Sequence, residues 1–239
     1  MENGLVKSLL EHSKNFVLIG EAGSGKTETG INLALAMAGL GARVHFFDMD
    51  QTKPLFRARG AADVLEAAGV TVHYGEQYMD APTVAPAVIE TLMDPNATVL
   101  LDIGGGAYGA HMIGQFSHIL DREGTTVFYL VNPYRPWSGS RENIAETMRR
   151  VTSASRLTKT CLVANPNLGL GTKTEDILAG MEKLRSLFPG QDFAFVCALE
   201  GAAKETETLV GAPVFPLRLY TLPEWLDGSG TRDQTEKEW

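Results

Sequence analysis

The chain has 239 residues and a net charge of −8. This length can bury a sizeable core as one large domain or at most two small ones. The acidic balance argues against a general nucleic-acid-coating role. No apolar run approaches the ~20 residues of a membrane-spanning helix, and the N-terminus lacks the basic and apolar regions of a signal peptide. We therefore expect a cytoplasmic protein without membrane or nucleic-acid partners.

A glycine-rich motif follows an apolar segment near the start of the chain. Residues 16–19 are Phe-Val-Leu-Ile, typical of a buried strand, and residues 20–27 read Gly-Glu-Ala-Gly-Ser-Gly-Lys-Thr. This matches G-x-x-x-x-G-K-[ST] between a strand and an apolar helical pattern, which is the context that the motif requires for binding nucleotide phosphates. The alternative, a glycine-rich turn before an ordinary helix, would be a rare coincidence at typical glycine usage.

The residues of this motif have distinct expected roles. Loop amides and the helix N-terminus direct positive partial charge at a phosphate. Lys26 neutralises the β- and γ-phosphates and acts in catalysis, and the Thr27 hydroxyl ligates Mg²⁺. Glu28 either helps to order the metal site or is a first-turn acid that the helix dipole favours. We expect nucleotide contacts from Glu21, Ala22, Gly23, Ser24, Gly25, Lys26, Thr27 and Glu28.

Strand-like and helical segments alternate along the rest of the chain. Repeated units of this length predict an α/β three-layer sandwich, in which a mostly parallel central sheet has helices on both faces and ligands lie at the carboxyl ends of the strands. We expect one nucleotide-binding domain over residues 1–223 and a polar tail over 224–239. The predicted strands are 43–47, 70–74, 98–102, 126–131, 160–164 and 193–198. The predicted helices are 61–68, 82–92, 107–120, 140–151 and 174–187.

Acidic residues follow two of these strands. Asp102 comes after four apolar residues and precedes a glycine-rich turn, Gly104–Gly106, that can approach a γ-phosphate. Because a P-loop metal is held by the loop hydroxyl and by an Asp at another strand end, we assign Asp102 to Mg²⁺. Asp48 and Asp50 follow the second strand, where one contacts the metal shell and the other orients the attacking water. The alternative is that one or both cap the next helix.

The segment Pro133–Trp137 follows the strand expected at 126–131. Its mixture of aromatic residues with Arg135 suits a partner or ligand surface. The alternative is a rigid loop that packs on the core.

Four motifs together resemble the MinD/ParA/nitrogenase-iron-protein group of SIMIBI-class P-loop ATPases, over roughly residues 15–217. They are the glycine-rich motif at 20–27, the pair Asp48 and Asp50, Asp102 with its glycine turn, and the turn at Asn165. The resemblance implies ATP and Mg²⁺ as ligands, a catalytic role for Asp50, and metal contacts from Thr27, Asp48 and Asp102. It also implies that Asn165 reads the adenine. The segment Val214–Pro216 resembles the loop that closes over the base in this group, with Pro216 in contact with the nucleotide.

One position departs from the pattern of that group. Its members usually carry a second lysine just after the first loop glycine, which acts across a nucleotide-sandwich dimer, whereas this chain has Glu21 there. A carboxylate cannot stabilise transition-state charge on a phosphate as a cation would, so the in-trans lysine mechanism does not carry over. Arg57 or Arg59 is a candidate source of the missing charge, unless both are merely solvated. Without such a cation we expect slow intrinsic hydrolysis.

The expected function is Mg²⁺-dependent ATP binding with weak or partner-stimulated ATPase activity, in a nucleotide-controlled switch or an accessory or maturation factor. We expect an unidentified protein partner and a nucleotide-dependent homodimer. Two alternatives stay open. An ATP-dependent synthetase of the dethiobiotin or cobyrinate type would require a small acceptor. A GTP-driven metallochaperone would require an Asn-Lys-x-Asp guanine motif and a Cys/His metal site, neither of which the sequence contains.

Overall fold

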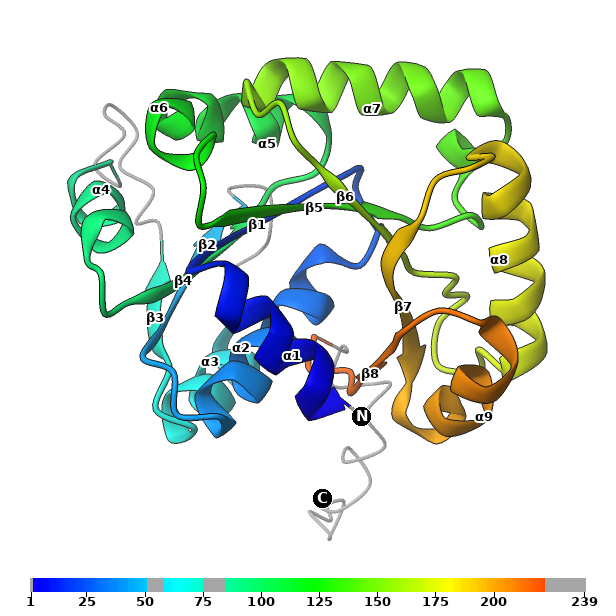
Figure 1. The fold of residues 1–239 in the computed structure, drawn as a ribbon, viewed down its shortest axis with the longest axis horizontal. Coiled ribbons are helices and arrows are strands. Elements are labelled where there is room, and N and C mark those ends of the chain that lie inside the picture. Colours follow the sequence, from blue (N-terminus) through cyan, green and yellow to red (C-terminus); the bar gives the residue numbers. More distant parts are fainter. Residues whose placement is uncertain (1, 51–57, 75–84, 222–239) are drawn as a thin grey trace, which may run out of the picture.

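A computed structural model describes residues 2–50, 58–74 and 85–221. The strands within these ranges form one eight-stranded sheet in the order β3-β2-β4-β1-β5-β6-β7-β8, and each strand is parallel to its neighbours (Figure 1). Such a sheet carries the carboxyl ends of all its strands at one edge. The strands are β1 (Asn15–Ile19), β2 (Val44–Met49), β3 (Thr71–Tyr74), β4 (Thr98–Ile103), β5 (Thr125–Val131), β6 (Cys161–Ala164), β7 (Phe193–Leu199) and β8 (Val214–Leu217).

Helices cover both faces of the sheet (Figure 1). Apolar residues of three helices form one buried cluster with one face of the strands: α1 (Glu2–His12), α2 (Lys26–Gly39) and α3 (Ala58–Ala67). A second cluster on the other face takes residues from α4 (Ala85–Met93), α5 (Gly106–Ile113), α6 (Ser117–Leu120), α7 (Arg141–Ser155), α8 (Thr174–Leu187) and α9 (Glu200–Val210). The predicted three-layer α/β fold is therefore confirmed.

The apolar run in β1 follows from its place between these two layers. Val17 and Ile19 belong to one buried cluster, and Phe16 and Leu18 belong to the other. Successive side chains of a strand point to opposite faces, so a strand covered on both sides is apolar at every position. Because β1 is buried on both faces, its position is fixed in the sheet, and so is the start of the P-loop directly after it.

Several predicted elements agree closely with the structure, and one is interrupted. The helix predicted over 174–187 is α8, and the Ser140 hydroxyl caps α7 by accepting a hydrogen bond from the backbone N–H of Asn143. The helix predicted over 107–120 is broken by a 3₁₀ turn at Gly114–Phe116. A side-chain carbon at Gly114 would lie 2.8 Å from the carbonyl oxygen of Ala154. The helix is therefore interrupted at a residue where its backbone lies close to α7.

The segment Val214–Pro216 differs from its predicted conformation. It was expected as a loop, but it forms most of β8, with Pro216 paired in register with Ala198 of β7. β8 lies at the edge of the sheet, where a proline that lacks an N–H is tolerated. Helices α1 and α9 were not predicted either.

Some expectations concern other features of the chain. The predicted tail over 224–239 lies outside the described residues, and the extent of the domain over 1–223 stays a prediction. Within the described ranges, none of the helices is both long and apolar enough to cross a lipid bilayer.

Candidate functional site

The P-loop, residues 20–25, connects the carboxyl end of β1 to the first turn of α2. The ammonium group of Lys26 donates hydrogen bonds to the backbone carbonyls of Gly20 (3.2 Å) and Glu21 (2.9 Å). Lys26 is only 6% exposed, so its charge is held against the loop. Gly25, immediately before α2, has a φ of +96°, which glycine adopts without steric cost. The loop thus has the conformation and charge that suit a phosphate group.

Hydroxyl and carboxylate oxygens lie close together beside the first turn of α2. The Thr27 hydroxyl donates a 2.7 Å hydrogen bond to Oδ2 of Asp102, which is fully buried. Asp48 of β2 is paired in register with Asp102, and its Oδ1 accepts a hydrogen bond from the backbone N–H of Asp50. A side-chain carbon at Gly104 would lie 3.0 Å from Oδ1 of Asp50. The structure therefore brings together the residues predicted to bind the metal and to orient water.

This donor set fits Mg²⁺ chemically. Hydroxyl and carboxylate oxygens are the hard ligands that Mg²⁺ prefers, and such sites usually use one or two carboxylates together with phosphate oxygens and waters. Among the described residues, no group of three His, Cys, Asp or Glu side chains is arranged to hold a metal ion by itself. A cation at Thr27 and Asp102 would therefore take its remaining ligands from phosphate and water.

The turn between β4 and α5 lies on the P-loop. The backbone N–H of Gly106 donates a 3.1 Å hydrogen bond to the carbonyl of Gly20. A side-chain carbon at Gly105 would lie 2.7 Å from the backbone of Ala22, so this approach requires glycine. The same turn also lies against Asp50. A change in the charge bound by the P-loop can therefore affect the position of the turn and that of the Asp50 side chain.

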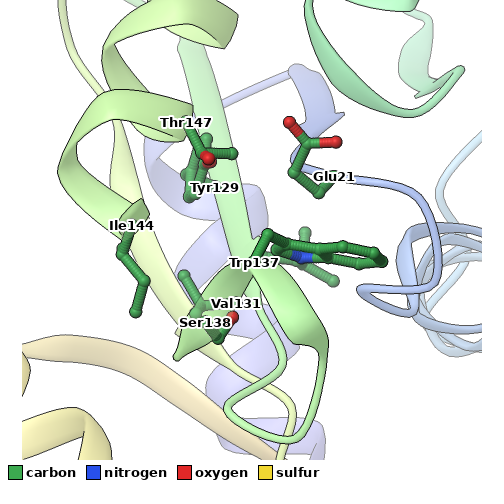
Figure 2. Close-up of a pocket in the computed structure, with 8 residues that line it drawn as sticks. Glu21, Tyr129, Val131, Trp137, Ser138, Ile144 and Thr147 are labelled. Atoms are coloured by element: carbon green, nitrogen blue, oxygen red, sulfur yellow. The ribbon is translucent and has the colours of Figure 1, made fainter. Parts of the chain in front are cut away.

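Glu21, at the position of the missing lysine, has its own surroundings within the chain. Figure 2 shows it beside Tyr129, Trp137 and Thr147, around a small cavity of about 10 Å³. Burial, and to a lesser extent the charge of Glu21, raise the pKa of Tyr129. A side-chain carbon at Gly106 would lie 3.1 Å from Oε2 of Glu21. The carboxylate therefore lies near the first turn of α5, where the helix dipole favours negative charge.

Asn165, directly after β6, contacts the backbone of the P-loop. Its Nδ2 donates a 2.8 Å hydrogen bond to the carbonyl of Ser24, and a side-chain carbon at Gly25 would lie 2.0 Å from that nitrogen. Oδ1 of Asn165 and the hydroxyl of Ser24 are buried without a hydrogen-bond partner among the described residues. Buried polar atoms of this kind are uncommon and often mark a site where a ligand or water binds. The role of Asn165 in adenine recognition stays a prediction.

Helix α2 also binds the chain segment after β8. The Glu28 carboxylate accepts hydrogen bonds from the backbone N–H groups of Tyr220 (2.9 Å) and Thr221 (2.7 Å). One turn further, Asn32 both accepts from the N–H of Arg218 (2.9 Å) and donates to its carbonyl (2.8 Å). Residues 218–221 are thereby fixed alongside the first two turns of α2. This contact between distant parts of the chain was not foreseen from the sequence.

The structure also shows a cation at the P-loop that sequence reasoning did not assign there. Nε of Arg135 donates a 3.1 Å hydrogen bond to the carbonyl of Gly23. Of the two arginines that the sequence suggested, Arg57 lies outside the described residues, as does the side chain of Arg59. A signal was present in the sequence, because Arg135 follows the strand predicted over 126–131 and so belongs to the ligand-binding edge of the sheet.

Comparisons with known proteins find similarity in structure alone. No protein-family model matches the sequence, and no curated protein matches it. The FtsY cell division protein of Thermotoga maritima is similar in fold, with a TM-score of 0.51 and 14% identity over 83% of this chain and 69% of that one. FlhF in complex with GTP and Mg²⁺ has a TM-score of 0.46 and 16% identity, over 71% of this chain and 65% of that one. The signal recognition particle receptor FtsY of Elizabethkingia anophelis has a TM-score of 0.44 and 21% identity, over 76% and 60%.

The likeness to the Thermotoga protein, together with the all-parallel sheet, supports an α/β P-loop NTPase fold. The chain spans less than two thirds of the length of two of these three structures. At identities this low the likeness concerns the fold alone. The narrower assignment to the MinD/ParA group therefore stays a prediction.

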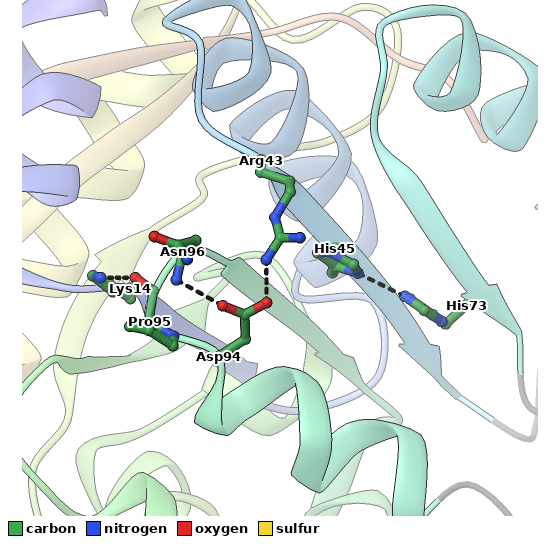
Figure 3. A network of polar contacts seen from close by, with 7 residues as sticks. All are labelled: Lys14, Arg43, His45, His73, Asp94, Pro95 and Asn96. Carbon is green, nitrogen blue, oxygen red and sulfur yellow. Dashed lines mark hydrogen bonds and ion pairs between the residues drawn. The ribbon is translucent and has the colours of Figure 1, made fainter.

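Away from the P-loop, two histidines of neighbouring strands lie side by side (Figure 3). Nδ1 of His45 and Nε2 of His73 are 3.0 Å apart, and the His73 ring stacks on Phe47 with ring centroids 4.0 Å apart. Burial lowers the pKa of both histidines; the charge of Arg43 adds to the effect at His45, and His45 adds to it at His73. At neutral pH both rings are therefore uncharged, and one can donate to the other.

The anchoring of residues 218–221 can be tested through Glu28. In a Glu28→Ala variant the backbone amides of Tyr220 and Thr221 lose their acceptor, so we expect their hydrogen exchange to accelerate by about tenfold or more. Exchange measured by NMR resolves both amides. A Glu146→Ala variant, changed at an exposed position of α7, should leave both rates unchanged. Equal protection in wild type and Glu28→Ala would contradict the anchoring role.

The histidine pair predicts a dependence of stability on pH. Because the folded pKa values are lowered from about 6.5, the unfolded chain binds more protons below that pH, and the free energy of unfolding falls as the solution is acidified. Urea unfolding at about pH 7.5 and about pH 5.5 measures this loss. We expect a smaller loss in His73→Gln than in wild type, and an unchanged loss in His118→Gln, which alters an exposed histidine. Equal losses in all three proteins would refute the effect.

Proposed function

We propose that this chain is a Mg²⁺-dependent ATP-binding protein with slow or partner-stimulated ATPase activity, which acts as a nucleotide-controlled switch like the MinD/ParA group that its sequence resembles. The observation that carries this proposal is the hydrogen bond between Thr27 and Asp102, beside the buried Lys26. It joins the first turn of α2, directly after the P-loop, to the end of β4 through the residue types that bind phosphate and Mg²⁺.

Each side chain of the site has a role in this proposal. Lys26 and the loop amides bind the phosphate chain. Thr27 and Asp102, together with Asp48, hold Mg²⁺, which neutralises phosphate charge when bound. Asp50 accepts a hydrogen bond from a water and orients it toward the γ-phosphorus. Hydrolysis then forms a bond from that water to phosphorus, breaks the bond to the β-phosphate oxygen, and yields ADP and inorganic phosphate.

The switch is proposed to act through the turn at Gly104–Gly106. This turn contacts both the P-loop, through Gly20 and Ala22, and the carboxylate of Asp50. The γ-phosphate adds or removes negative charge at this position, and packed elements respond to such changes by adopting a second discrete arrangement. Helix α5 begins at Gly106 and would transmit the change to α7, against which it packs.

Adenine is proposed to lie near Asn165, on the side of the P-loop that its side chain contacts. Pro216 of β8 precedes the segment 218–221, which Glu28 and Asn32 fix along α2. This arrangement brings the chain after β8 to the first turns of the helix that begins the phosphate site. Its support is positional, and recognition of adenine rather than guanine follows from the resemblance.

A protein partner is proposed to bind near the nucleotide. Tyr108, in the first turn of α5, is 75% exposed, and Leu168 and Leu170, in the segment after β6, are also exposed. Large apolar side chains around a site often belong to an interaction surface. A second copy of this chain, bound only in the presence of nucleotide, is the partner that the resemblance implies.

The proposal is tested by removing the phosphate-binding cation. In Lys26→Ala we expect the affinity for Mg²⁺-ATP, measured by calorimetry, to fall by about a hundredfold or more, because a buried charge-assisted contact with phosphate is lost. Lys204→Ala, changed at an exposed lysine of α9, should bind like wild type. Unchanged binding by Lys26→Ala would overturn the proposal.

Asp50→Ala separates binding from hydrolysis in the same experiment. It should bind Mg²⁺-ATP with nearly wild-type affinity, because the proposed role of Asp50 concerns water and not the phosphates. Release of inorganic phosphate should fall to a small fraction of the wild-type rate. Normal hydrolysis by this variant would remove Asp50 from the mechanism.

A further inference from the structure

The P-loop of this chain carries an acid where a second cation would assist phosphate binding. Glu21 occupies that position and lies near the first turn of α5. Lys26 supplies one positive charge from within the loop. The guanidinium of Arg135 approaches the same loop from outside: a side-chain carbon at Gly23 would lie 3.2 Å from its Nε and 3.4 Å from its Cζ.

The segments that follow β4, β5 and β6 contact successive residues of the P-loop, in the same order in which these strands lie in the sheet. The turn after β4 approaches Ala22, the segment after β5 brings Arg135 to the carbonyl of Gly23, and Asn165 after β6 donates to Ser24. Arg135 therefore contacts the P-loop between the turn after β4, which lies near the proposed metal site, and Asn165. Successive amides of this stretch are the ones expected to surround the phosphate chain. The guanidinium of Arg135 therefore lies beside the backbone whose amides are expected to bind phosphate.

The backbone that carries Arg135 is held firmly. Asn132, directly after β5, accepts a hydrogen bond from the N–H of Tyr134 (3.0 Å) and donates to the carbonyl of Asn167 (2.9 Å). The ammonium of Lys183, on α8, donates to the carbonyl of Pro133 (2.6 Å). Arg135 itself is exposed, although its backbone N–H is bonded to the carbonyl of Asn132. An anchored backbone with an exposed cationic side chain is a preorganised arrangement for binding an anion.

We propose that Arg135 is a phosphate-binding residue of the nucleotide site and supplies the charge that Glu21 does not; this inference rests on the proposed function. In the structure the guanidinium donates to the neutral carbonyl of Gly23. When nucleotide binds, it turns from that carbonyl to non-bridging oxygens of the phosphate chain. A phosphate oxygen adds the attraction of an opposite charge to this hydrogen bond, and the planar fork of arginine matches phosphate geometry.

The test compares Arg135→Ala and Arg135→Lys with wild type in titrations with Mg²⁺-ATP and Mg²⁺-ADP. We expect Arg135→Ala to weaken both affinities by about tenfold or more, because one charge-assisted contact is removed. Arg135→Lys should lie between Arg135→Ala and wild type, since it keeps the charge but not the fork. Arg150→Ala, an exposed arginine of α7, should bind like wild type.

A structural role is distinguished by two further measurements. Arg135→Ala should keep the thermal midpoint of the ligand-free protein, and added guanidinium ion at low concentration should restore part of its affinity for ATP. A lowered midpoint without such rescue would mean that Arg135 only supports the loop, which overturns the inference.

The outcomes also separate this inference from the proposed function. If wild type binds ATP, Lys26→Ala does not, and Arg135→Ala binds within about twofold of wild type, the inference fails and the proposed function stands. If wild type binds neither ATP nor ADP, the proposed function itself fails, and the inference with it.

Discussion

The parallel register of β1, β2 and β4 is the constraint on which the site depends. Leu18 and Asp48 are both paired in register with Asp102, so the P-loop and two carboxylates come to one edge of the sheet. Thr27 can therefore donate to a carboxylate 75 residues away in the chain. Asp102 is fully buried among apolar strand residues, and a buried carboxylate requires hydrogen-bonding or charged neighbours. The packing of the strands in the core therefore also determines where the side chains of the site lie.

The same edge explains how the chain accommodates an acid in its P-loop. Glu21 lies near the N-terminal turn of α5, whose dipole favours its negative charge. Arg135, delivered by the neighbouring strand, lies against Gly23 instead. The guanidinium of Arg135 thus reaches the P-loop from the end of a different strand of the same chain. If Arg135 binds phosphate as proposed, the second cation of the site comes from the same chain and requires no partner subunit.

Local patterns in the sequence predicted most of the elements and the motifs, but not the contacts between distant segments. Helix 174–187 was predictable from its periodicity and length, and the strand before the P-loop was predictable as a short apolar run directly followed by the glycine-rich motif. The contact of Glu28 with Thr221 joins residues 193 positions apart, and no local signal encodes such a partner. Val214–Pro216 was mistaken for a loop because a four-residue strand containing proline has little pattern of its own. The contact of Arg135 with the P-loop depends on strand order, which local periodicity does not give.

The central claim is that this site binds a nucleoside triphosphate with Mg²⁺ and prefers adenine. Calorimetric titration of the wild-type protein with ATP and with GTP, each with Mg²⁺, tests it most directly. The account predicts saturable binding of ATP and an affinity for GTP that is weaker by about tenfold or more. A preference for GTP would contradict the assignment of adenine recognition to Asn165. Binding of neither nucleotide would contradict the account of the site as a whole.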